Sequence, residues 1–376
     1  MHKQYDIAAY VWPSYTGQEP RSRMFWPEGN GEWQTVRSAQ PKFEGHQWPR
    51  KPLWGYVDEA NPDIMEMQIK SARSHGINIF IYDWYWFDER PFLEQCLNHG
   101  FLEAPNNKDM KFYLMWANHD AVSLWDKRLS GDSFAGNNLI WKGAVDKEAL
   151  EIIMDRVISR YFRKPNYYQI NGCPVFMIYD LHNLTTGLGG FAQTKDAISL
   201  FRQKTKAAGF PDLHLQMATW GLESLNLSGV DNNRTSSVED LVFDLGFDSV
   251  THYQFVHFAD VSKPYPDVLE QVDKEWKRIE TAYSIPYFPH ISIGWDNNPR
   301  FSQLIGPILS EATPENFKKG LELAKAFVDR HPEQPPLITI NSWNEWTEGS
   351  YLEPDDLYGY AYLDAVKEVF GSYDPI

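Results

Sequence analysis

The sequence predicts a single (β/α)8 barrel, and three observations support this fold. Eight short apolar runs rich in β-branched and aromatic residues recur along the chain, as expected of strands buried on both faces. Segments of helical periodicity lie between them, and strict alternation of strand and helix implies a parallel sheet. Eight repeats without a break in composition favour a closed barrel over an open doubly wound sheet. We therefore expect one domain over residues 1–376.

The expected strands are residues 5–12, 77–84, 111–117, 174–179, 213–219, 247–253, 288–294 and 336–343. The expected helices are residues 61–75, 91–99, 147–162, 194–208, 229–244, 268–283, 314–330 and 356–370. Asn61 and Thr313 each precede a proline, which is typical of a helix N-cap followed by proline in the first turn. Gly76 and Gly371 suit helix C-termini. The segment 229–244 begins with polar residues, so we expect this repeat to be irregular.

Composition and charge exclude several classes of function. Hydrophobic residues make up 43% and charged residues 23% of the chain, which is ordinary for a globular protein with a substantial core. The net charge of −16 opposes binding to nucleic acids and anionic membranes. No apolar run reaches the roughly 18 residues of a membrane span. The start MHKQYDIAAYVW holds no signal peptide, although Met1 could replace a removed leader, so a periplasmic or secreted enzyme stays open.

A long, aromatic-rich connection follows the first expected strand. Residues 13–59 carry Tyr15, Phe25, Trp26, Trp33, Trp48, Trp54 and Tyr56. Structureless loops of this length in compact domains are usually functional. Because it follows a strand, we expect it to cover the barrel end at which active sites are built.

Polar and aromatic side chains collect where the expected strands end, which is where barrel enzymes place their catalytic groups. The candidate substrate-binding residues there and in the long loop are Trp12, Tyr15, Trp54, Asp83, Trp84, Trp116, Asn118, His119, Tyr179, Trp220, His252, Tyr253, Trp295, Asp296, Asn344 and Trp346. Indole faces stack on sugar rings while carboxylates, amides and imidazoles bind hydroxyls. We expect at least two of Trp54, Trp84, Trp295 and Trp346 to line the cleft.

Glu345 and Glu348 are the candidate catalytic residues. Glycoside cleavage needs one carboxyl group to protonate the departing oxygen and a second to act as base or nucleophile. Gly349 and the adjoining Asn and Thr favour an irregular turn that directs both carboxylates into one cleft. The alternative is that both are first-turn carboxylates favoured by the helix dipole.

Other candidates have structural alternatives of their own. Asp83 binds substrate or caps loop amides, and Trp295 with Asp296 binds substrate or simply forms a turn. His119 and His252 are open between substrate contact and internal hydrogen bonding. Cys96 and Cys173 are expected to be core thiols. No metal-binding or phosphate-loop spacing is present, since GLGG at 187–190 lacks a preceding strand and a following lysine; we expect no cofactor.

The segment NSWNEWTEGSYLEPDDLYGYAYLDAVKEVF resembles the C-terminal signature of WbsX-type proteins, which are similar to glycoside hydrolase family 99, the endo-α-mannosidases and endomannanases. The segments HGINIFIYDWYWF, FYLMWAN, YYQINGCPVFMIYD and GWDNNPR match as well, in the same order across nearly the whole chain. The resemblance implies a (β/α)8 barrel and a retaining hydrolase without a carboxylate nucleophile. In that family the first Glu of NEW-x-EG deprotonates the sugar's 2-hydroxyl and the second protonates the leaving group.

Carried onto this chain, the base is Glu345 and the acid is Glu348. The third-strand motif of WbsX-type proteins commonly reads WANE, whereas here WAN is followed by His119. That departure leaves the roles of the third-strand residues, and with them the substrate, open. The resemblance favours an oligo- or polysaccharide containing an α-mannoside or a related sugar such as a rhamnoside.

Two rival functions remain open. One is a glycosyltransferase, the activity for which WbsX-type proteins were named, but no nucleotide-sugar domain with a Gly-rich turn is apparent. The other is a non-catalytic glycan-binding protein, against which the presence of both Glu345 and Glu348 argues. Sugar identity, linkage, endo or exo action and oligomeric state do not follow from the sequence.

Overall fold

Parallel strands form a nearly closed barrel. The computed structural model describes residues 4–125, 138–222, 225 and 237–373. Its barrel strands are β1 (Asp6–Val11), β2 (Ile79–Phe87), β4 (Lys111–Trp116), β8 (Cys173–Ile178), β9 (His214–Ala218), β10 (Ser249–Thr251), β11 (His290–Ser292) and β12 (Leu337–Asn341). They pair in the order β10-β9-β8-β4-β2-β1-β12-β11. A parallel bridge between Val250 and Tyr287, just before β11, joins the two ends of that order.

The expected strands are therefore confirmed, each within a few residues of its expected limits. Shorter strands lie outside the barrel order: β3 (Arg90–Phe92), β5 (Ala121–Val122), β6 (Leu139–Trp141), β7 (Gln169–Ile170), β13 (Asn344–Glu345) and β14 (Ser350–Tyr351). β3 pairs antiparallel with β2, β5 with β6, β7 with β8 and β13 with β14. All but β7 lie beyond the carboxyl ends of barrel strands.

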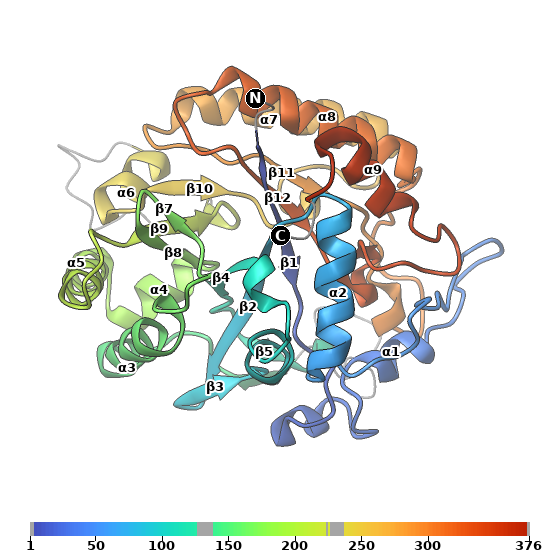
Figure 1. Cartoon of the computed structure of the whole chain (residues 1–376), viewed down its shortest axis with the longest axis horizontal. Coiled ribbons are helices and arrows are strands. Elements are labelled where there is room, and N and C mark those ends of the chain that lie inside the picture. The colour runs from blue at the N-terminus through green and yellow to red at the C-terminus, as the bar shows by residue number, and fades with distance from the viewer. Residues whose placement is uncertain (1–3, 126–137, 223–224, 226–236, 374–376) are drawn as a thin grey trace.

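Helices surround the barrel (Figure 1). They are α1 (Trp33–Arg37), α2 (Pro62–Ser74), α3 (Lys147–Val157), α4 (Leu181–Leu188), α5 (Phe191–Ala207), α6 (Val238–Leu245), α7 (Tyr265–Ala282), α8 (Pro314–Arg330) and α9 (Ala361–Phe370). Asn61 and Thr313 cap α2 and α8 by accepting backbone N–H bonds. Residues of 229–244 before Ser237 lie outside the described residues, and α6 accounts for the rest of that expected helix.

Two helical segments differ from the sequence expectation. Residues 91–99 do not form an α-helix, because Arg90–Phe92 return along β2 as a hairpin and Cys96–Phe101 form a π-helical turn. The hairpin buries Phe92 against other aromatic rings, including Trp125, and this packing outweighs local helical periodicity. An additional helix, α4, precedes α5; Gly189 ends it in the left-handed conformation, so the last two glycines of GLGG separate two helices.

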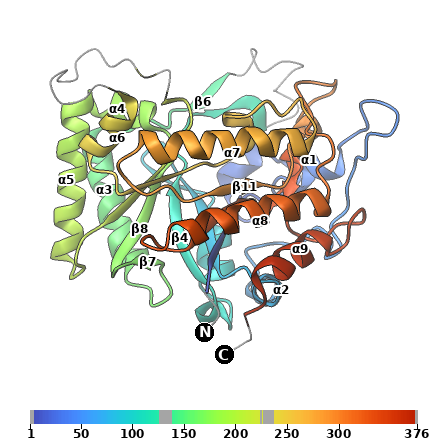
Figure 2. The same cartoon turned by 90° about the horizontal axis from the view of Figure 1, so that it is seen from above.

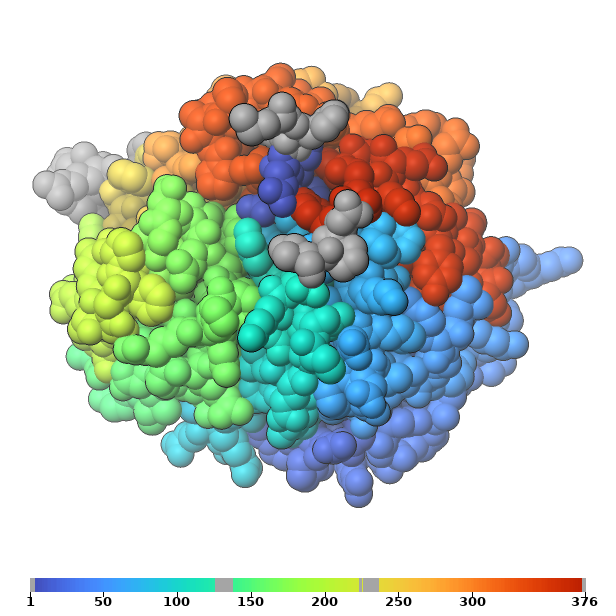
Figure 3. All heavy atoms as spheres, in the orientation of Figure 1, coloured from blue at the N-terminus to red at the C-terminus, as the bar shows by residue number. Residues whose placement is uncertain are grey.

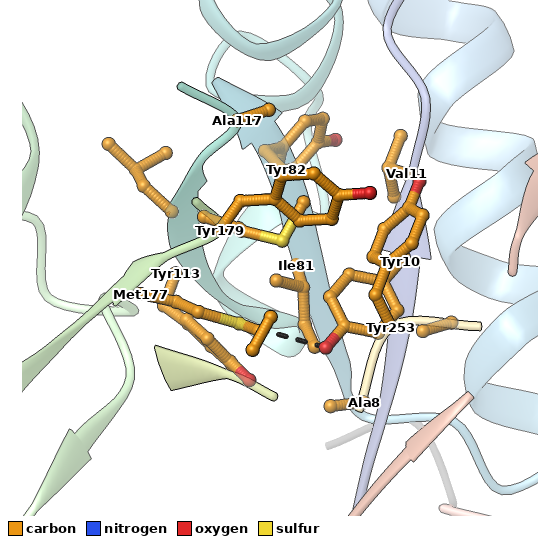
Figure 4. Close-up of a cluster of buried hydrophobic side chains, with 14 of the residues drawn as sticks. Ala8, Tyr10, Val11, Ile81, Tyr82, Tyr113, Ala117, Met177, Tyr179 and Tyr253 are labelled. Carbon is orange, nitrogen blue, oxygen red and sulfur yellow. Dashed lines mark hydrogen bonds between the residues drawn. The ribbon is translucent and has the colours of Figure 1, made fainter. Parts of the chain in front are cut away.

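Tyrosine and methionine side chains fill the barrel interior (Figure 4). The Tyr10 hydroxyl donates to Met177 Sδ at 3.6 Å, and the Tyr10 ring packs edge-on against Tyr253 with centroids 4.8 Å apart. Tyr113 donates to Gln216 Oε1 at 3.0 Å. These buried contacts make the lower barrel a packed core, and in such barrels sites are built beyond it, at the carboxyl ends of the strands.

The 13–59 loop covers that open end, as expected. Glu32 from this loop bonds to Arg300, which follows β11, and Trp33 packs against Trp346 with ring centroids 5.6 Å apart. Figure 2 shows α1, which belongs to this loop, at the end of the barrel opposite the chain termini. The loop therefore helps to build the rim of the site.

The opposite face carries both termini. In the space-filling view, successive parts of the chain follow one another around this face (Figure 3), as a barrel of alternating strands and helices requires. Cys96 is buried as expected, whereas Cys173 is only half-buried because it is the first residue of β8, at the strand's edge. In the described part of the chain, no helix combines the length and apolarity needed to cross a bilayer.

Candidate active site

A cavity of about 240 Å³ opens at the carboxyl ends of the barrel strands. Its walls are aromatic and its polar groups are mainly carboxylates. The lining residues are Trp12, Asp83, Tyr85, Met115, Ala117, His119, Leu124, Trp125, Tyr179, Trp220, Tyr253, Arg300, Glu345 and Glu348. They come from the ends of β1, β2, β4, β8, β9, β10 and β11 and from the turn after β12, so the cavity is assembled from almost the whole ring of strands.

Glu345 and Glu348 lie in a short hairpin that leaves β12. β13 and β14 pair antiparallel, with Asn344 opposite Tyr351 and Glu345 opposite Ser350. The Ser342 hydroxyl accepts the backbone N–H of Glu345 at 2.7 Å and donates to the Ser350 carbonyl at 2.6 Å. The residues between the strands form a single 3₁₀ turn. The pair is therefore held in an irregular turn, and the alternative of first-turn helix carboxylates does not apply.

Gly349 is required where this turn closes. Its φ of +63° lies in the left-handed region, and a Cβ there would meet Asp296 Cβ at 3.0 Å, a contact that larger residues avoid. The backbone N–H of Asp296 donates to the Glu348 carbonyl at 2.6 Å. The segment after β11 thus packs directly against the turn that carries Glu345 and Glu348 and fixes the backbone at Glu348.

Tyr253 joins two carboxyl groups in the cavity. Its hydroxyl lies 2.9 Å from Asp83 Oδ2 and 3.1 Å from Glu345 Oε1. A phenol has one proton to donate, so satisfying both contacts requires one carboxyl group to donate in return. Asp83, Tyr253 and Glu345 therefore form a chain that retains a proton.

Arg300 provides the cavity's cationic charge. Its Nη1 lies 2.8 Å from Glu348 Oε1, its Nε 3.2 Å from Glu32 Oε1, and its Nη2 3.8 Å from Glu345 Oε2. The other oxygen of Glu32 accepts the Trp12 indole N–H at 2.6 Å. The long loop thus supplies Glu32 to orient Arg300, and Arg300 in turn links both candidate catalytic carboxylates.

Burial and charge set the protonation of these groups. Burial, followed by the charge of Glu348, raises the pKa of Glu345 well above its usual value. Burial also raises the pKa of Glu348, but Arg300 opposes that rise. The pKa of Asp83 is raised well above its usual value by burial. Of the two catalytic candidates, Glu348 is therefore the carboxyl group that ionises more readily.

The structure brings together about half of the residues expected in the site. Glu345 and Glu348 line the cavity with Trp12, Asp83, His119, Tyr179, Trp220 and Tyr253. The others do not line it: Tyr15, Trp54, Trp84, Trp116, Asn118, His252, Trp295, Asp296, Asn344 and Trp346. The expectation that two of Trp54, Trp84, Trp295 and Trp346 would line the cleft is therefore not met in this cavity.

Strand alternation explains the indoles at the ends of β2 and β4. Successive side chains of a strand point to opposite faces, and Asp83 and Tyr85 both reach the cavity. Trp84 must therefore point outward, where its indole donates to Glu94 at 2.8 Å. By the same alternation Met115 and Ala117 reach the cavity and Trp116 does not.

Several polar candidates are instead bonded within the protein. Asn344 joins the turn to β1 by accepting from Trp12 N at 2.8 Å and donating to Trp12 O at 2.9 Å. Asn118 makes a similar pair with the backbone of Asp180. His252 is buried, 2.8 Å from the Tyr287 hydroxyl and stacked on Phe258. These side chains shape the rim without facing the cavity.

Asp296 and the remaining aromatic candidates are also in structural positions. The Asp296 carboxylate contacts His46 Nε2 at 2.7 Å and the Trp48 indole at 2.6 Å; these bonds outweigh burial and hold its pKa below the usual range. Trp346 stacks on Tyr351 and Trp54 donates to the Tyr360 hydroxyl at 2.8 Å. Of the remaining two, Tyr15 is buried in the core, and Trp295 is half-buried and packs against the edge of the core.

Sequence reasoning missed Arg300, Glu32, Tyr85 and Trp125. Tyr85 could have been found by continuing the alternation that begins at Asp83. Arg300 ends the GWDNNPR motif, which follows an expected barrel strand. A site built around Glu345 and Glu348 needs a cation to balance their charge, so this arginine could have been singled out. Glu32 and Trp125 follow no strand periodicity, because loop packing alone places them. Among the described residues, no group of three or more His, Cys, Asp or Glu is arranged to hold a metal ion.

Comparisons with known proteins agree with this architecture. An uncharacterised protein, WxcX of Xanthomonas campestris pv. campestris, is 28% identical over 360 residues, which cover 93% of this chain and 47% of that protein. The chain therefore spans about half the length of the curated relatives it matches. The GH99 endo-alpha-mannosidase from Bacteroides thetaiotaomicron aligns with 98% of this chain and 92% of its own, at 14% identity and a TM-score of 0.57.

A glycoside hydrolase-like protein aligns with 98% of this chain and 94% of its own, at 15% identity and a TM-score of 0.60. Likeness at these identities shows a shared fold and leaves activity open. The family model described as Glycosyltransferase WbsX matches residues 7–366. Because that match spans nearly the whole chain, this protein belongs to the WbsX family.

Proposed function

We propose that this protein is a retaining glycoside hydrolase that cleaves an α-linked glycan. The observation that carries the proposal is the pair of buried carboxyl groups, Glu345 and Glu348, around one guanidinium in an aromatic-walled cavity. Two carboxyl groups in different environments are what glycoside cleavage requires. The fold shared with a GH99 endo-alpha-mannosidase supports the same reaction class.

The proposed reaction uses the substrate's own 2-hydroxyl. Glu345 removes the proton of this hydroxyl, the oxygen attacks the anomeric carbon, and the glycosidic bond breaks as Glu348 protonates the departing oxygen. Water then attacks the anomeric carbon of the 1,2-anhydro sugar and gives its proton to Glu348, while Glu345 returns its proton to the 2-oxygen. Both carboxyl groups end in their starting states, and two inversions retain the configuration.

The electrostatics of the pair favour a proton on Glu345 rather than on Glu348, the reverse of these roles. The pKa of Glu345 is raised well above its usual value, whereas Arg300 opposes the rise at Glu348. The proposed reaction therefore requires the proton held by Asp83, Tyr253 and Glu345 to move to Glu348 before the first step. If the roles are instead reversed, Glu345 is the acid and Glu348 the base, and the experiment below separates the two assignments.

The charge of the cavity favours a neutral sugar. Among the described residues that line the cavity, three carboxyl groups, Asp83, Glu345 and Glu348, face a single cationic side chain, Arg300. An anionic sugar would add negative charge beside carboxyl groups whose ionisation is already opposed by burial. An α-mannoside, or a related sugar with a free 2-hydroxyl such as a rhamnoside, is the substrate class we propose.

The test is hydrolysis of α-mannosides and α-rhamnosides with natural and activated aryl leaving groups, followed by NMR of the first product. Retention and resistance of 2-deoxy substrates are expected. An aryl leaving group needs little protonation, so it should partly rescue the Gln variant of the acid and not that of the base. Rescue of Glu348→Gln supports the proposed roles, and rescue of Glu345→Gln reverses them. Efficient turnover of a 2-deoxy substrate would exclude the anhydro route.

A second candidate is transfer from a nucleotide sugar, which the family's description favours. Incubation with a panel of nucleotide sugars and acceptor glycans distinguishes it. Product that depends on the nucleotide donor, without hydrolysis of any glycan, would replace the hydrolase proposal.

A further inference from the structure

A second carboxyl pair lies behind the catalytic turn, on the side away from the cavity. Glu59 ends the long loop and Glu353 follows β14, and both side chains are buried. Gln68 of α2 donates one amide group to both, at 3.2 Å to Glu59 Oε1 and 2.7 Å to Glu353 Oε1. Because one nitrogen bonds to an oxygen of each, the two carboxyl groups are close neighbours, and burial followed by the charge of Glu59 raises the pKa of Glu353.

This pair holds the residues on either side of Glu345. Asn344 Nδ2 donates to both oxygens of Glu59, at 3.1 and 2.9 Å. The Trp346 indole donates to Glu353 Oε2 at 2.6 Å. A third contact runs through Gln68, whose carbonyl accepts the Trp343 indole at 3.3 Å. The catalytic turn is therefore bonded from behind at 343, 344 and 346.

No cation is bonded to the pair among the described residues. The groups that face Glu59 are the amides of Gln68 and Asn344, the Cys96 thiol at 3.7 Å and Glu353. Asp58 and Tyr82 add acidic groups to this neighbourhood. Two buried carboxylates without a cation repel one another and lose their hydration, and a proton on one of them relieves the repulsion.

We propose that Glu59 and Glu353 share a proton and act as positioning residues that hold the catalytic turn, so that its geometry depends on pH. Only the naming of Glu345 as the positioned group rests on the proposed function. The shared proton lets both carboxyl groups accept bonds from Asn344 and Trp346 without mutual repulsion. Loss of protons from the pair loosens the turn.

The direction of the pH effect follows from burial, which raises the pKa of Glu59 to about 7 and that of Glu353 well above its usual value. The folded protein then binds more protons than the unfolded chain between the ordinary Glu value of 4.5 and about 7. Stability from the pair is therefore full below the lower value and is lost as pH rises through this window.

The experiment uses the Glu353→Gln and Glu59→Gln variants in the full chain. Infrared difference spectra between the unmodified protein and Glu353→Gln, taken just above neutral pH, should show a protonated-carboxyl band that the variant lacks, beside the band that Asp83 and Glu345 give in both proteins. The fall of melting temperature with rising pH should become shallower in each variant. A difference spectrum without that band for either variant, or an unchanged melting profile, would overturn the shared proton. These readouts need no substrate, so they stand even if the hydrolase proposal fails.

Positioning of the turn is tested separately with Glu353→Ala, which leaves the Trp346 indole without its acceptor. A displacement of about 1 Å at a catalytic group lowers kcat about 100-fold; we expect that loss with little change in KM, and recovery with Glu353→Gln. The matched control is Glu94→Gln, a buried carboxylate that also accepts an indole N–H but pairs with Arg156. Equal kcat in Glu353→Ala and the unmodified enzyme would overturn the positioning role. If Glu353→Ala does not fold, the pH profile of Glu353→Gln decides: the fall of kcat with rising pH that the unmodified enzyme shows must be absent for the role to stand.

Discussion

Glu94 and Glu345 are similarly buried carboxyl groups with opposite electrostatics. Glu94, outside the barrel wall, is 8% exposed and accepts from Trp84 and Tyr161 at 2.8 Å and from Arg156 Nε at 3.0 Å. Glu345 is 4% exposed; Tyr253 contacts one oxygen, and Arg300 stands 3.8 Å from the other.

Burial raises the pKa of both groups, but at Glu94 the bond and charge of Arg156 outweigh burial and the pKa falls below its usual value. At Glu345 burial and Glu348 prevail over Arg300, and the pKa rises. The comparison teaches that a cation at hydrogen-bond distance opposes the effect of burial on a carboxyl group, and that the balance of the two sets the ionisation. Glu94 is thereby fixed as a charged support, whereas Glu345 retains a proton.

The largest expected effect is on kcat, when the carboxyl groups in the cavity are replaced. Glu345→Gln and Glu348→Gln keep the side-chain shape but neither accept nor donate the required proton. We expect each to lower kcat by about 10² to 10⁴-fold with an unchanged circular dichroism spectrum. Measured hydrolysis rates check this, and full activity in either variant would remove its catalytic role.

Removing Arg300 should raise the pKa of Glu348 further, so that it resembles that of Glu345. Arg300→Met leaves Glu348 and Glu32 buried beside a neutral side chain, and breaking a buried ion pair in this way costs about 3 to 5 kcal/mol. Denaturant unfolding should show that loss, and it should shrink at acid pH as the carboxyl groups become protonated. Unchanged stability near neutral pH would mean that Arg300 does not balance their charge.

Removing the carboxylate of the Glu94–Arg156 pair should lower the free energy of unfolding less than Arg300→Met does, with a defined pH dependence. Glu94→Gln removes the charge that Arg156 binds; because the Arg156 side chain is 28% exposed, water replaces part of this bonding, and we expect a total loss of about 1.5 to 3 kcal/mol. Because the folded pKa lies below the usual 4.5, this stability is present above that value and is lost as pH falls through the folded pKa. The variant and the unmodified protein should therefore converge in acid. A difference that persists in acid would attribute the effect to packing.

The smallest expected effect separates indoles that line the cavity from those that do not. Trp220 lines it, whereas Trp54 bonds to Tyr360 outside it. Trp220→Ala should weaken glycan binding about tenfold, equivalent to about 1.4 kcal/mol, and Trp54→Ala should leave the dissociation constant unchanged. Each Trp variant would be combined with Glu345→Gln, so that the glycan is bound but not cleaved, and its dissociation constant measured by calorimetric titration. Equal effects of the two Trp variants would contradict the placement of the site in this cavity.

The sequence alone determined the barrel and the position of the turn that carries its two candidate catalytic carboxyl groups. Periodicity marked the barrel strands, since a strand buried on both faces is a short apolar run whatever it packs against. Glu345 and Glu348 could be singled out because they follow β12 in one contiguous segment. Trp84 and Trp116 were misplaced although alternation, itself a property of the sequence, points them away from Asp83, Tyr85 and Met115.

Tertiary structure alone decided which charges meet. Glu32 reaches Arg300 across 268 positions of sequence, and Gln68 reaches Glu353 across 285. No local pattern encodes such distances, because side chains from loops and helices are brought together only when the barrel closes. The pKa of each carboxyl group depends on those neighbours and on burial, so protonation at the site is a property of the folded molecule.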